Sequence, residues 1–195
     1  MSKHTSATER GRFLRRFIRR DDGAVAIEFA FIFPALFAFT IGILEFGLVL
    51  FDFHRAGEAT RRASRLAIIQ DPLATLDTLR TTNLAIDCTA TSGGVVSCTS
   101  TTNNGDSDAN FDAMLDAMQA VFPDILATNV QVGYVASGID NVNNEEVVTA
   151  LVTVSLTGVT HSFVALGIIP GAPSSMTFPA FSTSALRATE VITPP

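Results

Sequence analysis

Residues 24–51 form an apolar run in which Glu28 and Glu45 are the only charged side chains. A helix of this length is about 42 Å long, which exceeds the roughly 30 Å hydrocarbon core of a bilayer. The apolar region of a secretory signal is usually only about 7–15 residues long, so removal of the chain's start after this run is not expected. The run therefore predicts a transmembrane helix over residues 24–53.

A short basic arm precedes the apolar run. Residues 1–23 contain seven of the thirteen Lys and Arg residues of the chain, whose net charge is -6. Such an arm could bind nucleic acid. Beside a long apolar run, however, the positive-inside rule favours an arm that stays in the cytoplasm. We therefore expect a cytoplasmic leader over residues 1–23, the lipid bilayer as a partner and no nucleic-acid partner.

The predicted helix continues beyond the membrane. Four alanines, Ala56, Ala59, Ala63 and Ala67, recur at helical spacing and form a narrow apolar stripe together with Leu66. Pro72 is a stop signal. Residues 54–70 are therefore predicted to be an amphipathic extension of the same helix.

Residues 71–195 are predicted to form an α+β domain. Asp108 can cap a helix whose apolar face is Phe111, Met114, Leu115, Met118, Val121 and Phe122. From Asn129 the apolar period changes to two, and four runs separated by turns predict an antiparallel meander: residues 130–134, 147–158, 160–168 and 176–190. Pro179 indicates that the last strand starts irregularly or lies at an edge. We expect the helix to pack on one face of a sheet of three or four strands.

Cys88 and Cys98 are the two cysteines of the chain. With the N-terminus in the cytoplasm, both lie on the oxidising side of the membrane, where a disulfide would close a hairpin around Ser92-Gly93-Gly94. Such a bond would stabilise the fold by about 2–3 kcal/mol. Two unpaired thiols are the alternative.

The position of Glu28 is energetically unfavourable, because placing a carboxylate near the membrane interior costs on the order of 3 kcal/mol. Carboxylates in such positions usually have a function. Glu28 could instead reach the head groups or meet a partner within a helix bundle. Neither alternative explains why Gly23 precedes it by five residues, at the boundary between the charged and the apolar segments.

The segment Gly23-Ala24-Val25-Ala26-Ile27-Glu28-Phe29 resembles the processing site of type IV pilin-like proteins. With the basic leader and Pro34 in the following tract, residues 10–75 are similar to TadE-like pseudopilins of the tight-adherence (Tad/Flp) system. The resemblance implies cleavage between Gly23 and Ala24 by a prepilin peptidase. It also implies that Glu28 pairs with the new amine of a neighbouring subunit during assembly.

The same resemblance implies further properties. Flp-type pilins and their pseudopilins carry a tyrosine after the glutamate, where this chain has Phe29. Independently of the resemblance, Pro34 cannot donate a helical hydrogen bond and is expected to kink or locally loosen the helix, with a role in packing as the alternative. Expected partners are a prepilin peptidase, other pseudopilins, the major Flp pilin and the inner-membrane assembly platform. The expected location is the bacterial inner membrane, with a single span, a periplasmic C-terminal domain and possible incorporation into a pilus.

The sequence contains no recognisable catalytic set, and the three histidines lie in unrelated segments. The stretch from Asp106 to Asp112 resembles the start of a calcium loop, but it lacks the glycine and the final glutamate that such loops need. We expect no enzymatic activity, no cofactor and no metal site. The alternative function is an uncleaved, membrane-anchored periplasmic binding or scaffold protein, in which Gly23 would be only a helix-boundary residue.

Overall fold

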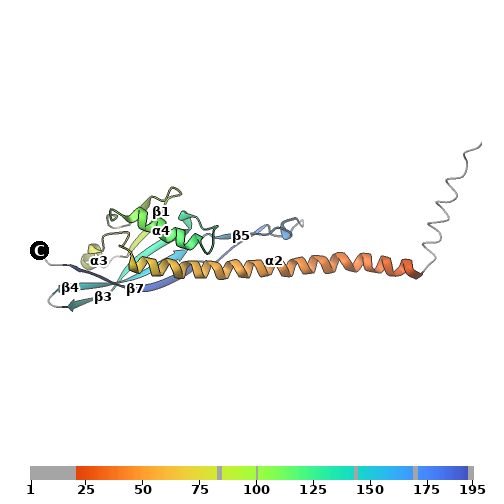
Figure 1. Cartoon of the computed structure of the whole chain (residues 1–195), viewed down its shortest axis with the longest axis horizontal. Helices are drawn as coiled ribbons and strands as arrows, with labels where there is room; N and C mark the ends of the chain where they lie inside the picture. Colours follow the sequence, from red (N-terminus) through yellow and green to blue (C-terminus); the bar gives the residue numbers. More distant parts are fainter. Residues whose placement is uncertain (1–20, 83–84, 100, 143–144, 169–170, 193–195) are drawn as a thin grey trace, which may run out of the picture. The chain divides into compact units, whose positions relative to one another are not determined.

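The computed structural model describes residues 21–82, 85–99, 101–142, 145–168 and 171–192 (Figure 1). The predicted leader therefore lies almost entirely outside the described residues. The chain divides into two compact units, the first ending at Gly47 and the second beginning at Leu48.

One long helix dominates the N-terminal part of the chain. Helix α2 runs from Asp21 to Ile69 and is continuous through Pro34. It ends shortly before Pro72, as predicted. The expectation of a long apolar N-terminal helix followed by an α+β domain is confirmed.

The second unit is α+β, as expected, with a five-stranded antiparallel sheet in the order β2-β1-β3-β4-β7. A separate two-stranded sheet pairs β5 with β6. The helices and strands after α2 are α3 (Asp77–Thr82), β1 (Ile86–Ala90), β2 (Val96–Cys98), α4 (Ser107–Gln119), η1 (Ala127–Asn129), β3 (Val130–Val142), β4 (Glu145–Leu156), β5 (Thr160–Ser162), η2 (Leu166–Ile168), β6 (Ser175–Thr177) and β7 (Phe181–Ile192).

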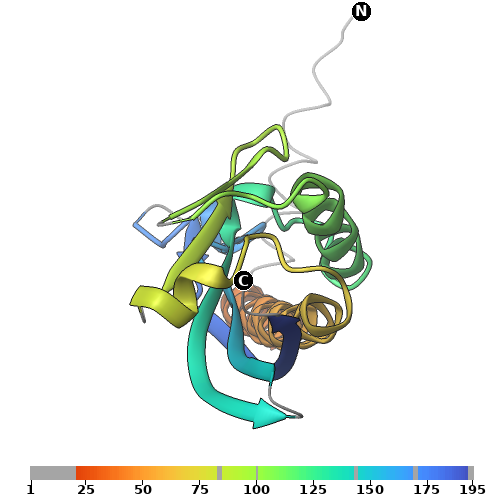
Figure 2. The ribbon, with the colours of Figure 1, turned by 90° about the vertical axis from the view of Figure 1, so that its left-hand side faces the viewer.

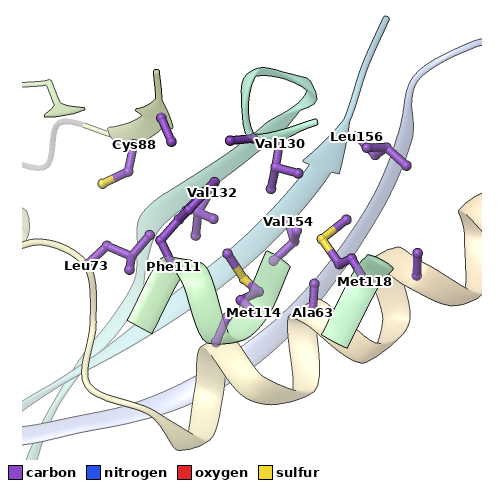
Figure 3. Close-up of a cluster of buried hydrophobic side chains, with 14 of the residues drawn as sticks. Ala63, Leu73, Cys88, Phe111, Met114, Met118, Val130, Val132, Val154 and Leu156 are labelled. Carbon is purple, nitrogen blue, oxygen red and sulfur yellow. The ribbon is translucent and has the colours of Figure 1, made fainter. Parts of the chain in front are cut away.

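The core of this unit lies between one face of the sheet and two helices (Figure 2). The alanine stripe of α2 is almost wholly buried, and small side chains allow the helix backbone to lie close to the strands. Helix α4 contributes Phe111, Met114 and Met118, which meet Val132 and Val154 from the sheet (Figure 3). The predicted helix-on-sheet packing is confirmed.

Helix α4 begins differently from the prediction. Asp106 is its N-cap residue and makes no side-chain capping hydrogen bond. Asp108 lies inside the first turn, where its Oδ1 accepts a hydrogen bond from the Val96 backbone N–H at 2.8 Å. The predicted capping role of Asp108 is therefore wrong, because strand β2 supplies a nearby backbone donor that the sequence pattern does not reveal.

The third predicted strand of the meander is also wrong. Only Thr160–Ser162 is a strand, and it pairs with β6 rather than with β4. Strand β7 pairs directly with β4 and is an edge strand that begins at Phe181, after Pro179. The apolar composition of residues 160–168 predicts a strand. In the structure these residues form the short strand β5 and part of the loop that connects β5 to β6.

A disulfide joins Cys88 to Cys98 across β1 and β2. The two residues are directly opposite in the antiparallel register, and their Cα atoms are 4.1 Å apart. The hairpin turn between them includes Gly94 at φ 79°, a conformation that glycine adopts without strain.

Candidate functional site

The N-terminal part of α2 carries the predicted processing and assembly residues. The side chains of residues 24–40 are all exposed, so none is covered by other parts of the described chain. In the described part of the chain, α2 is the one helix that is long and apolar enough to cross a membrane. An apolar helix without a protein cover fits a lipid environment or a bundle with other helices.

Glu28 lies on this exposed surface. It has no hydrogen-bond or ion-pair partner within the described residues, although it is flanked by apolar side chains. Gly23 precedes it by five residues, which is about 7.5 Å along a helix axis. Ala24 is four residues before Glu28, and residues at this spacing lie on the same face of a helix. An amine on Ala24 and the Glu28 carboxylate would thus be neighbours.

Phe29 begins a row of aromatic side chains that the sequence reasoning did not identify. The ring centroids of Phe29 and Phe33 are 5.5 Å apart, and those of Phe33 and Phe37 are 5.9 Å apart. Three phenylalanines at a spacing of four could have revealed this row. Phe29 contacts Phe33 through its ring, and this contact needs no tyrosine hydroxyl.

Glu45 differs from Glu28 in its surroundings. Its exposed fraction is only 5%, although it belongs to the same apolar run. Gly42 and Gly47 flank it, and a Cβ atom added at either glycine would meet nothing within 4 Å. The two carboxylates of the apolar run therefore occupy different environments, and Glu28 is the one exposed along the bare helix.

A second polar cluster lies where the apolar run of α2 ends. Asp52 Oδ2 is 2.7 Å from Nδ1 of His161 in β5, and Asp52 Oδ1 is 3.9 Å from Nη1 of Arg55. Arg55 also donates from Nε to the Val121 carbonyl at 2.6 Å and lies over the Phe122 ring. Sequence reasoning missed this cluster, because His161 and Asp52 are separated by more than a hundred positions.

An open depression of about 460 Å³ adjoins this cluster, and its lining includes Asp52, Asp124, Asn129 and His161. Asn129 is already engaged, since it bonds the backbone at Leu126 and Thr157. Among the described residues no group of three or more His, Cys, Asp or Glu side chains is placed to hold a metal ion. The depression lies where residues of α2, η1 and β5 come together.

The chain is similar to one known protein family, and the similar segment lies in helix α2. A family model described as TadE-like protein matches residues 23–65. Residues 23–65 are TadE-like. The matched segment begins at Gly23 and includes Glu28, and it ends within the alanine stripe that packs on the sheet.

The TadE-like match implies a role in Tad pilus systems and an association with other components of these systems. The single apolar helix fits a membrane-anchored protein of such a system. Neither a curated protein nor a solved structure matches the chain.

Proposed function

We propose that this TadE-like chain is a minor pilin, or pseudopilin, that takes part in the assembly of adhesive Flp/Tad pili. It is inserted in the bacterial inner membrane with residues 1–23 in the cytoplasm and residues 71–195 in the periplasm. A prepilin peptidase cuts it between Gly23 and Ala24. The observation that carries the proposal is the exposed Glu28, five residues after Gly23 on an apolar helix that has the TadE-like pattern.

The chemistry of cleavage supports this role. Hydrolysis after Gly23 removes the arginine-rich arm and creates a positive amine on Ala24. Two opposite charges in a low-dielectric medium offset each other's desolvation, and such a pair can fix the register of packed helices. The amine of one subunit and the Glu28 carboxylate of a neighbour would form this pair. The spacing of four also permits pairing within one subunit.

The disulfide agrees with the proposed orientation. Disulfides persist in oxidising compartments such as the bacterial periplasm and are rare in the cytoplasm. Cys88 and Cys98 both follow the apolar run, so a cytoplasmic N-terminus would place them in the periplasm. The proposed partners are the peptidase, other pseudopilins, the major Flp pilin and the inner-membrane platform.

The Glu28→Gln variant tests the assembly role. This substitution removes the charge and keeps the size of the side chain, so we expect normal membrane insertion and normal cleavage but loss of piliation. Pili sheared from cells that carry the variant as their sole copy are quantified, and the processed form is followed by immunoblotting.

The matched control is Glu58→Gln, a carboxylate on the same helix that forms exposed ion pairs with Arg61 and Arg62. This control should leave piliation unchanged, because exposed ion pairs contribute little to stability. Wild-type piliation in the Glu28→Gln strain would contradict the role assigned to this carboxylate.

A further inference from the structure

The C-terminal part of α2 has a basic surface that the proposed function does not use. This basic surface consists of Arg61, Arg62 and Arg65, which are exposed on the side of the helix away from the buried alanine stripe. Glu58 lies 3.9 Å from Arg61 and 3.7 Å from Arg62. Within the described residues, no ion pair joins these three arginines to another helix or strand. Three arginines beside one glutamate leave this surface with a net positive charge.

Helix α4 has the opposite charge. Its sequence contains Asp108, Asp112 and Asp116 and no Lys or Arg. A spacing of four places the three aspartates along one side of the helix, and all three are exposed. Asp108 accepts the hydrogen bond from the Val96 N–H through Oδ1. We therefore define the acidic stripe of α4 by the other two residues, Asp112 and Asp116.

Two contacts show how α4 lies along α2. The side-chain amide of Asn110, near the start of α4, donates to the Asp71 carbonyl at 3.2 Å, just beyond the end of α2. At the other end, Arg55 of α2 donates to the carbonyl of Val121, which follows α4. Helix α4 is therefore antiparallel to α2 and runs alongside residues 55–71.

These contacts place the two charged surfaces at matching heights along α2. The acidic stripe lies between the two contact points on α4, and the basic surface lies between the two contact points on α2. A second copy that is parallel to the first and displaced sideways can thus bring its acidic stripe to the basic surface of the first copy. Copies that are anchored in one bilayer through the same helix share this parallel orientation.

We propose that copies of this chain associate side by side, with the basic surface of one copy against the acidic stripe of the next. The occupant is a second copy because one chain carries both complementary charges at matching heights. The two surfaces are different parts of the chain, so the contact is heterologous and can repeat from copy to copy. A single exposed ion pair contributes little affinity, whereas complementary charged surfaces select the partner and fix its register. The inference rests on the proposed function only in that α2 holds the copies parallel in one bilayer.

Carbodiimide coupling joins an amine to a carboxylate that it contacts, and Lys3 is the only lysine of the chain. The Arg65→Lys variant of the full chain keeps the charge of the basic surface and supplies an amine there. Arg65 is chosen rather than Arg62, because the ion pair of Arg62 with Glu58 would favour coupling within one copy. The variant and the wild type are reconstituted in phosphatidylcholine–phosphatidylglycerol vesicles, whose lipids have no primary amine. Products are separated on denaturing gels, and the joined positions are identified by mass spectrometry of digests.

We expect Arg65→Lys to form dimers and higher multimers in which position 65 is joined to Asp112 or Asp116. The wild type should give no product that involves position 65. Addition of Asp112→Asn and Asp116→Asn should abolish these products, whereas addition of Asp124→Asn, at an exposed carboxylate outside the acidic stripe, should leave them. The products should also decrease as NaCl is raised, because the screening length falls from about 10 Å at 0.1 M to about 3 Å at 1 M.

Three outcomes would contradict the inference. If Arg65→Lys is membrane-integrated but gives no coupling between copies, the side-by-side contact is overturned and the membrane anchor stands. Coupling of position 65 to other carboxylates, or coupling that persists after Asp112→Asn and Asp116→Asn, would also overturn it. Integration is measured by resistance to carbonate extraction, and a chain that is extracted would contradict both the anchor and the inference.

Discussion

At the scale of single residues, two side chains hold the C-terminal end of α2 and the segment that follows it. Arg187 from β7 donates to the carbonyls of Ala67 and Gln70, which have no partner within the helix. The Tyr134 hydroxyl accepts a hydrogen bond from the Leu73 N–H at 3.1 Å. Burial raises the pKa of Tyr134 above its usual value of 10.0, opposed by the Leu73 hydrogen bond and the charge of Arg187.

Replacement of Arg187 tests how much this cap contributes to the free energy of unfolding. We expect Arg187→Met to lower the free energy of unfolding by about 1.5–3 kcal/mol, because two charge-assisted hydrogen bonds to the end of α2 are lost. The measurement is denaturant unfolding of the full chain in detergent. The control is Arg61→Met, whose ion pair with Glu58 is exposed and should cost less than about 1 kcal/mol. Equal stability of the two variants would contradict the capping role.

The same residues mark a limit of prediction from sequence. The strand that contains Arg187 was expected from the alternation of its neighbours, but the alternation does not say which backbone carbonyls a long side chain will reach. Likewise, nothing local to Asp52 indicates His161. These contacts depend on the tertiary arrangement of segments that are distant in the chain.

At the scale of elements, long periodic segments were predictable and short ones were not. The continuous helix α2 follows from its apolar run and alanine stripe, and β4 from its strict alternation. Residues 160–168 were predicted to be the third strand of the meander, because a short apolar run has no period that distinguishes a strand from an apolar loop.

The disulfide of the β1–β2 hairpin is predicted to stabilise the folded protein. We expect replacement of both Cys88 and Cys98 by alanine to reduce the free energy of unfolding by about 2–3 kcal/mol, because the disulfide closes a short loop in the unfolded chain. Unfolding is compared with and without reductant. Reductant should destabilise the wild type and leave the double variant unchanged. A wild-type protein that reacts with two equivalents of a thiol reagent after unfolding, without reduction, would contradict the pairing.

At the scale of the whole molecule, the candidate site could be proposed from the sequence because its residues are close together in the chain. Gly23, Ala24 and Glu28 lie within six consecutive positions of one helix, so their spacing in sequence fixes their spacing in space. The domain that follows was predictable as a class, with a helix on an antiparallel sheet, but not in its strand order. The sequence contained no signal that β1 would join the sheet between β2 and β3, since this pairing connects segments on either side of α4.

The mass of the N-terminus tests the central claim most directly. The full chain is co-expressed with its cognate prepilin peptidase, and the purified protein is measured intact and after digestion. We predict a mature chain that begins at Ala24, and loss of this form in Gly23→Ala. A chain that keeps its leader in cells with an active cognate peptidase would contradict the account and would favour an uncleaved, membrane-anchored scaffold protein.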